Sequence, residues 1–397
     1  MKHFAPSIAI DRLPAPVFAE LANRIGAVKA AGHDVITLGQ GTPDQTTPVH
    51  ILDALKQAID EPTNLQYPPF RGHDFLKQAV ASFYANEFGV TIDPATEVAI
   101  LLGSKAGIVA LPQTIVNPGE GVIVPDPGYP DYLSGAALAG AYPITLPLLE
   151  KNNFLPDYDL LDTTDVERAR MLFLNYPSNP TGATATAEAF EQTVAFADAH
   201  DICVVHDLAY GGISFDGPTR SFLQTEGAKD VGIELFSLSK RFNMSGFRIA
   251  FAIGNPSVIS SIETYQEHLY VSAFTPIQHA ATVALTSDQT CVRELSSLYE
   301  TRRDALFAKL DAIGWSGPRP GGSFFVWLPV PEGYTSQSFT DHLLDEVHVA
   351  VTPGSFFGEY GEGYVRISLI ADVERLEEAV GRIGTLNLFR TPVAEQF

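Results

Sequence analysis

Short apolar runs that alternate with helical patterns through the middle of the chain constrain its fold most strongly. The runs that we interpret as strands cover residues 98–102, 121–124, 141–146, 170–174, 202–206, 234–238 and 249–253. Helical patterns lie between them, for example over residues 186–200, where Phe190, Val194 and Ala197 share one face. Strands separated by helices predict βα units, so we expect an α/β fold with a mainly parallel seven-stranded sheet.

The pattern changes after about residue 286. The elements expected there are a helix over 289–313, a strand over 323–328, a helix near 336–346, strands over 348–351 and 363–368, and a helix over 373–389. This order is typical of a smaller α+β domain. A helix over 17–30, stopped by Gly32, is expected to pack with that domain.

The composition favours an ordinary globular enzyme of two domains, because 397 residues can bury a large core. A net charge of −22 disfavours nucleic acid and anionic membranes as partners. Cys203 and Cys291 do not suggest a disulfide framework, and Pro6 and Asp11 interrupt the region where a secretory peptide would be apolar. No run approaches the roughly 18–20 apolar residues of a membrane span. We therefore expect a cytoplasmic protein.

Several polar side chains in the middle of the chain are suited to one kind of chemistry. In chain order they are Asn179, Asp207, Tyr210, Ser237, Lys240 and Arg248. A phosphorylated pyridine aldehyde needs an amine for its aldehyde, an anion for its ring nitrogen, and donors for its phenolate and phosphate. Out of context, Asn-Pro-x-Gly is only a turn signal and a single lysine is usually solvated. The inference of a site for such an aldehyde therefore rests on the set as a whole. No metal is expected.

With its Ser-x-x-Lys and Lys-x7-Arg spacings, the set resembles that of fold-type-I aminotransferases of class I/II, which depend on pyridoxal 5′-phosphate (PLP). The resemblance extends from the run 38–41 to Arg366 and implies transfer of an amino group between an L-amino acid and a 2-oxo acid. It also implies a large PLP-binding domain over 47–286 and a small C-terminal domain over 287–397. Residues 1–46 would form an N-terminal arm and part of the small domain.

The resemblance assigns Lys240 as the lysine that forms a Schiff base with PLP and then carries a proton at the substrate. Asp207, at the end of an apolar strand, would face the ring nitrogen; the alternative is a helix or turn cap. Tyr210 and Asn179 would contact the phenolic oxygen of the ring, and Asn179 also the substrate carboxylate. Tyr129 matches the aromatic that stacks on the ring, although a lone aromatic is more often part of a core.

The PLP phosphate would be held by several loops. Gly103, Ser104 and Lys105 follow an expected strand and open a helix, so backbone N–H groups and the helix dipole would face an anion. The resemblance adds Ser237 and Arg248 to this phosphate site.

Three further positions match residues that bind substrate or a partner in the family. Arg366 matches the arginine that grips the substrate α-carboxylate in a bidentate pair, a task lysine performs poorly; the alternative is a buried structural ion pair. Gly41 matches the glycine whose backbone approaches the same carboxylate. Tyr67 matches the tyrosine sent across the interface to the neighbour's phosphate, which implies a homodimer with shared active sites; the alternative is a loop aromatic.

A narrower resemblance concerns the substrate. The runs 39–41, 104–107, 205–210 and 331–336 look like those of Bacillus-type methionine-salvage aminotransferases, which convert 4-methylthio-2-oxobutanoate to methionine. Diaminopimelate-forming aminotransferases share a similar Gly-Ser-Lys loop. Aspartate-specific relatives place an arginine in the stretch that matches 267–276, where this chain has neither lysine nor arginine. We therefore expect a substrate with an uncharged, extended side chain, methionine and its keto acid among the best.

Other functions stay open at this point, because a fold does not fix a reaction. A PLP-dependent carbon–sulfur lyase would use the same residues and release pyruvate and ammonia from a cysteine conjugate. Aminotransferases for aspartate, aromatic or diaminopimelate-type substrates are also compatible. An aminotransferase-like sensor of a transcription regulator is disfavoured, because Gly39 lies too near the start for a preceding DNA-binding domain and the charge is acidic.

Overall fold

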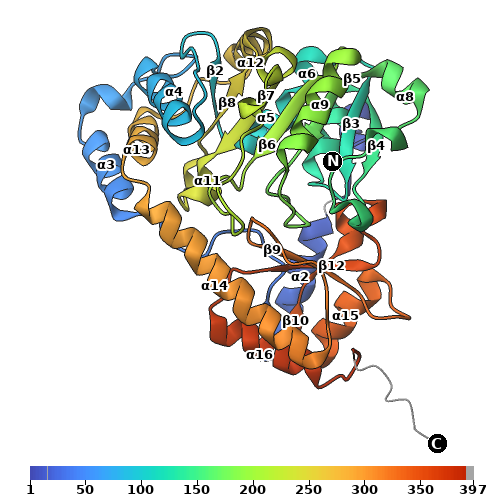
Figure 1. Ribbon diagram of the computed structural model, residues 1–397. Coiled ribbons are helices and arrows are strands. Elements are labelled where there is room, and N and C mark those ends of the chain that lie inside the picture. Colours follow the sequence, from blue (N-terminus) through green and yellow to red (C-terminus); the bar gives the residue numbers. More distant parts are fainter. Residues whose placement is uncertain (16, 390–397) are drawn as a thin grey trace, which may run out of the picture.

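The computed structural model describes residues 1–15 and 17–389, which form two lobes (Figure 1). The large lobe, residues 49–286, is built on a seven-stranded sheet with helices on both faces. The small lobe combines residues 17–37 near the start of the chain with residues 290–384. The blue N-terminal helix α2 therefore lies among the orange and red elements of the small lobe.

The strand order in the large sheet is β2-β8-β7-β6-β5-β3-β4. The strands are β2 (Val98–Leu101), β3 (Gly121–Asp126), β4 (Tyr142–Pro147), β5 (Ala169–Leu174), β6 (Cys203–Leu208), β7 (Gly232–Ser237) and β8 (Ala250–Gly254). All neighbours are parallel except β8, which runs antiparallel to both β2 and β7. The predicted α/β fold with a mainly parallel seven-stranded sheet is confirmed.

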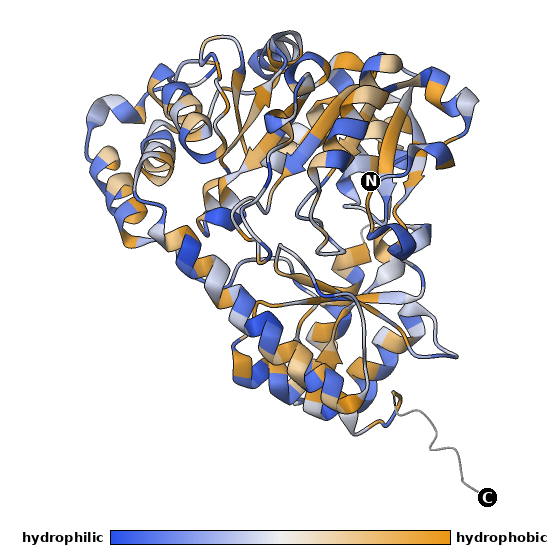
Figure 2. Ribbon diagram, viewed as in Figure 1, coloured by the Kyte–Doolittle hydropathy of each residue, from blue (hydrophilic) through white to orange (hydrophobic). Residues whose placement is uncertain are grey.

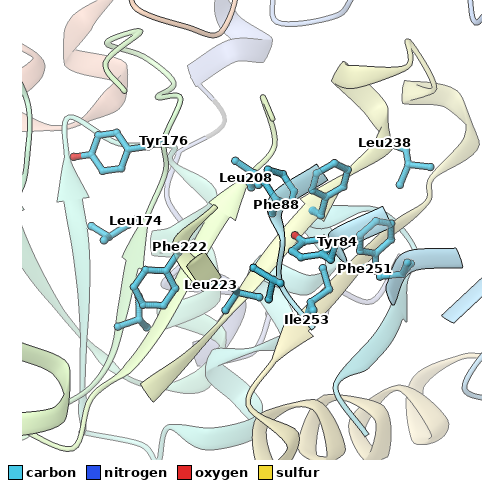
Figure 3. Close-up of a cluster of buried hydrophobic side chains, with 14 of the residues drawn as sticks. Tyr84, Phe88, Leu174, Tyr176, Leu208, Phe222, Leu223, Leu238, Phe251 and Ile253 are labelled. Carbon is cyan, nitrogen blue, oxygen red and sulfur yellow. The ribbon is translucent and has the colours of Figure 1, made fainter. Parts of the chain in front are cut away.

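Most residues of these strands are apolar and buried, because helices cover both faces of the sheet. Val98 and Ile100 of β2 face one core, whereas Ala99 and Leu101 face the other. Figure 2 shows the resulting apolar strands inside helices with polar outer surfaces. Figure 3 shows part of the first core, where Tyr84 packs with side chains from several strands.

The helices of the large lobe fill the connections between strands. They are α3 (Val49–Ile59), α4 (Asp74–Phe88), α5 (Ser104–Ala110), α6 (Pro112–Ile115), α7 (Asp131–Ala139), α8 (Thr163–Arg168), α9 (Ala187–Ala199), α10 (Ala228–Val231), α11 (Leu238–Arg241), α12 (Pro256–Leu269) and α13 (Thr275–Thr286). The helix expected over 186–200 is α9, and Thr186 caps it by accepting the backbone N–H of Ala189 at 3.1 Å. A short helix, α1 (Ile8–Asp11), precedes the small lobe.

The small lobe contains an antiparallel sheet of order β11-β12-β9 and a parallel pair, β1 with β10. Its elements are α2 (Val17–Ala30), β1 (Ile36–Thr37), α14 (Thr290–Ile313), β9 (Phe325–Pro329), α15 (Ser336–Val347), β10 (Val349–Ala350), β11 (Thr352–Pro353), β12 (Tyr364–Ser368) and α16 (Val373–Gly384). The pairing of β1 with β10 connects the N-terminal segment of the chain to the C-terminal part of the small lobe. The long helix α14 runs from the large lobe down to α16 (Figure 1).

One predicted element is too long. The helix expected over 373–389 ends at Gly384, and the chain turns through Asn387, whose φ of 54° is left-handed. Asparagine tolerates that conformation better than most residues, so it can follow a helix end. Phe389 then stacks on Trp315 at 4.6 Å between ring centroids. Within the described residues, no helix is both long and apolar enough to cross a membrane.

Candidate active site

A cavity of about 500 Å³ lies where the two lobes meet. Its polar lining includes residues from the loop after β1, the start of α5, the carboxyl ends of β5 and β6, α11 and β12. The predicted site residues that line it are Gly41, Ser104, Lys105, Tyr129, Asn179, Asp207, Tyr210, Lys240 and Arg366. Strand ends of a parallel sheet therefore gather side chains that lie far apart in the sequence.

Asp207 is a buried carboxylate with one oxygen left free. Its Oδ2 accepts a hydrogen bond from the Tyr132 hydroxyl at 3.0 Å. Its Oδ1 is buried, yet finds no hydrogen-bond partner among the described residues. Burial raises the pKa of the Asp207 carboxyl to about 6, although the Tyr132 hydroxyl favours the ionised form. An orphaned carboxylate oxygen in a cavity wall is suited to a bound donor.

Lys240 lies on α11, and its Nζ donates to the carbonyl of Gly41 at 2.6 Å. Burial, with the charges of Arg366 and Arg248, lowers the pKa of the Lys240 amine to about 8. A lysine with such a pKa provides free amine near neutral pH, as a nucleophile requires. The solvated loop lysine considered above is not what the structure contains.

Arg366 lies on β12 and is 3% exposed. Its Nη1 donates to Asn179 Oδ1 at 2.7 Å, and its Nη2 donates to the carbonyl of Gly39 at 2.8 Å. Its guanidinium lies 4.1 Å from the ring centre of Phe325. Burial lowers the pKa of Arg366 to about 10. A buried cation whose partners are neutral acceptors is not in a structural ion pair, and it suits an incoming anion.

Four of the expected phosphate residues lie at the start of α5, namely Gly103, Ser104, Lys105 and, through its guanidinium, Arg248. Gly103 has a φ of 88°, and a Cβ there would collide with the guanidinium of Arg248. Ser237 ends β7 and caps α11. Lys105, besides lining the cavity, pairs with Asp131 at 3.0 Å. Gly103, Ser237 and Arg248 are not among the residues that line the cavity itself.

Two other predicted features lie outside the cavity of the described chain. Tyr67 is 90% exposed, and the ion pairs of Arg71 with Glu263 and Glu267 hold its loop against α12. The stretch 267–276 does not line the cavity either; Leu269 and others from it border a neighbouring hollow.

Sequence reasoning missed several residues of the site. Tyr132 supports Asp207, and Asn175 donates to the Asp207 carbonyl at 2.7 Å while its Oδ1 accepts from the N–H of Asn179 at 2.7 Å. Asn175 could have been found, because it follows a strand in the same way as Asp207. The missed apolar wall comes from α2 and consists of Phe18, Leu21, Ala22 and Ile25. The sequence predicted that this helix packs with the small domain, but nothing in it indicated that the helix also faces the strand ends of the large sheet.

Comparisons with known proteins agree with this geometry. The family model described as aminotransferase class I and II matches residues 33–383. The chain belongs to the class I and II aminotransferases. This aminotransferase is 54% identical to the L-glutamine--4-(methylsulfanyl)-2-oxobutanoate aminotransferase of Bacillus subtilis, an alignment that covers 97% of both chains. It is 43% identical to an LL-diaminopimelate aminotransferase of Halothermothrix orenii, over 94% of this chain and 96% of that one.

Solved structures of the family have the same fold. The apo-BacF structure from Bacillus subtilis superposes with a TM-score of 0.95 at 44% identity, covering 98% of this chain and 100% of that one. The protein is therefore an enzyme that moves an amino group between an amino acid and a 2-oxo acid. Family and fold depend in general on PLP.

Proposed function

We propose that this aminotransferase binds PLP in the cavity and transfers an amino group to 4-methylthio-2-oxobutanoate, forming methionine. The buried, orphaned Oδ1 of Asp207 is the observation that carries the cofactor assignment. The protonated pyridine nitrogen of PLP would donate the hydrogen bond that this oxygen lacks. The amine of Lys240 lines the same cavity and suits the aldehyde.

PLP, when bound, supplies a conjugated ring that accepts the electron pair left on the substrate α-carbon. Asp207 keeps the ring nitrogen protonated and so sustains that withdrawal. Lys240 moves the proton between the substrate α-carbon and the former aldehyde carbon, acting as base and then as acid. Tyr210 and Asn179, which line the same cavity, would hold the phenolic oxygen of the ring, and Tyr129 would stack on its face.

The phosphate is proposed to bind at the start of α5, where Gly103, Ser104 and Lys105 offer backbone and side-chain donors. Arg248 and Ser237 complete this site. For Lys105 this role requires a phosphate beside or in place of its present partner Asp131. The close contact between Gly103 and Arg248 supports the proposal, because it holds a cation against a helix start.

The substrate is proposed to place its α-carboxylate on Arg366, beside Asn179 and Gly41, and its side chain along α2. Phe18, Leu21 and Ile25 make that wall apolar. A carboxylate would be costly to bury there, whereas each buried methylene contributes about 0.8 kcal/mol. The printed name of the 54% identical relative points to the same oxo acid, with glutamine as amino donor.

We further propose a cytoplasmic homodimer in which Tyr67 reaches the neighbour's phosphate and residues 267–276 face the neighbour's substrate. The exposure of Tyr67 and of Leu269 supports this arrangement. We place the large domain at 47–286 and the small domain at 1–46 with 287–397, of which residues 390–397 lie outside the described residues.

A comparison of substrates tests the proposal. We expect the highest kcat/KM with methionine and glutamine among amino acids that also include aspartate, phenylalanine and LL-diaminopimelate, each paired with the same oxo acid. Aspartate or LL-diaminopimelate winning by tenfold, about 1.4 kcal/mol in transition-state binding, would replace the methionine assignment. Release of pyruvate and ammonia from a cysteine conjugate without an oxo acid would favour the lyase.

A further inference from the structure

The buried Arg302 of α14 forms a partly buried ion pair with Asp44, a residue without a role in the proposed mechanism. Its Nη2 donates to Asp44 Oδ2 at 2.8 Å and its Nη1 to Asp44 Oδ1 at 3.1 Å. The Tyr299 hydroxyl, one turn earlier on α14, also donates to Asp44 Oδ1, at 3.0 Å. Arg302 side-chain exposure is 5% and that of Asp44 is 21%.

Asp44 lies in the loop between β1 and α3, whose stretch 39–44 carries two functional carbonyl groups into the cavity. The carbonyl of Gly41 accepts from Lys240 at 2.6 Å, and that of Gly39 accepts from Arg366 at 2.8 Å. This loop therefore sets the positions of both cations. How firmly Lys240 and Arg366 are held therefore depends on how this loop is attached to the rest of the fold.

Arg302 also reaches the strand that bears Arg366. Its Nη1 donates to the carbonyl of Leu369 at 2.9 Å, directly after β12. Ser368 in turn joins the strand to the loop, because its N–H and hydroxyl both donate to the carbonyl of Leu38 at 2.8 Å. One guanidinium thus links α14 to the loop and to the Arg366 strand.

The ionisation of Asp44 favours a fixed connection between Asp44 and Arg302. Burial alone would raise the pKa of Asp44, but the hydrogen bond and charge of Arg302 outweigh it and lower that pKa. Asp44 is therefore ionised at neutral pH. A bidentate arginine–carboxylate pair fixes orientation as well as distance, which a lysine cannot do.

We propose that Arg302 is a positioning residue that presets Arg366 and the Gly41 carbonyl for the substrate α-carboxylate. The inference rests on the proposed function, because there Arg366 is the carboxylate ligand. Displacement of a binding group by about 1 Å can cost about a hundredfold in rate even when the mutated residue lies far from the chemistry. Loss of the ion pair should therefore impair carboxylate recognition specifically.

Arg303 provides a matched control on the same helix. It is 7% exposed and pairs with the exposed carboxylates of Glu300 and Asp304, so its loss also removes two ion pairs of a buried arginine. Its other hydrogen bond goes to the carbonyl of Pro320, and none of these partners belongs to the loop 39–44. Arg302→Met and Arg303→Met should both lower the melting temperature, which separates stability from positioning.

The experiment uses the PLP-loaded enzyme and two fragments of methionine. Calorimetry with 4-(methylsulfanyl)butanoate, which lacks the amino group, measures carboxylate binding without turnover. A single-turnover reaction with 3-(methylsulfanyl)propylamine, which lacks the carboxylate, measures chemistry without Arg366. We expect Arg302→Met to raise the Kd of the acid and the KM of methionine by about tenfold or more and to leave the amine rate unchanged. Arg303→Met should change none of the three.

Asp44→Asn keeps the size of the side chain and tests the same link if Arg302→Met does not fold. We expect it to raise the Kd of the acid in the same direction, and where Arg302→Met folds, the double variant should show no further rise. Equal effects of the Arg302 and Arg303 substitutions on the Kd of the acid, or equal slowing of amine and methionine in Arg302→Met, would overturn the inference. An unchanged Kd of the acid in Arg366→Met would instead count against the proposed function.

Discussion

Replacing Tyr132 with phenylalanine removes one hydroxyl and tests how the protein controls the charge of Asp207. The hydroxyl donates to Asp207 Oδ2 at 3.0 Å, and both side chains are buried. The ring itself should stay in place, because it stacks on Phe173 at 4.8 Å between ring centroids. The substitution therefore changes a single hydrogen bond.

The expected magnitude follows from the difference between charged and neutral hydrogen bonds. A bond to a charged group is worth about 1.5–3 kcal/mol, and one between neutral groups about 0.5–1.5 kcal/mol. The difference, about 1–1.5 kcal/mol, corresponds to about one pKa unit. Burial already raises the pKa of Asp207 to about 6. In Tyr132→Phe we expect that pKa to rise by about one further unit.

The sign of the pH effect follows from linkage. Because the folded pKa is raised, the folded enzyme without PLP holds the proton of Asp207 more tightly than the unfolded chain does. Its contribution to stability is present below the unfolded pKa and is lost as pH rises through the folded pKa of about 6. In Tyr132→Phe, this contribution to stability should be lost over a pH range that extends about one pH unit higher.

Urea unfolding of the PLP-free enzyme at pH 5 and pH 8 measures this effect. We expect Tyr132→Phe to cost about 1–1.5 kcal/mol more at pH 8 than at pH 5. Tyr158→Phe is the control, because the Tyr158 hydroxyl bonds to Thr193, which does not titrate, at 2.7 Å. Its cost should be the same at both pH values. An equally pH-independent cost in Tyr132→Phe would refute the reasoning.

Three further predictions concern the cofactor and the partner chain. Gly103→Ala should weaken PLP affinity by about tenfold or more, because its backbone conformation is strained for other residues by about 1–3 kcal/mol and a Cβ would collide with Arg248. Gly119→Ala, with a φ of 89° but open space around it, should lose stability without losing PLP affinity in a fluorescence titration. Asp207→Asn should bind PLP yet lower kcat more than it raises KM, and unchanged turnover would remove Asp207 from the ring nitrogen. Mixing inactive Lys240→Ala and Tyr67→Phe chains should restore one of the two sites in each heterodimer, about a quarter of all sites in an equal mixture, if Tyr67 acts in trans, and a fully active monomer would contradict that role.

The sequence predicted the sheet well because each strand is a local apolar run that helices cover on both faces. It could not predict that β8 runs antiparallel to its neighbours, since an apolar run has the same composition in either direction. The end of α16 at Gly384 was also missed, because the apolar pattern continues to Phe389 although the helix does not. In both cases tertiary packing decides what the local pattern leaves open.

For the candidate site, the sequence predicted the residues whose spacing carries information. Asp207, Lys240 and Arg366 do line one cavity, as the family resemblance implied. Tyr132 and Arg302 were out of reach, because each acts through a partner that is distant in the sequence. Such supporting contacts depend on tertiary packing between distant segments, which no local pattern encodes.

The most direct test of the account is the site at which PLP attaches. Borohydride reduction of the PLP-loaded enzyme, followed by digestion and mass spectrometry of the peptides, should place the pyridoxyl group on Lys240. The buried amine of Lys240, with its pKa lowered to about 8, shares the cavity with the free Oδ1 of Asp207. Recovery of the modification on Lys105 or Lys229 instead would contradict the proposed active site.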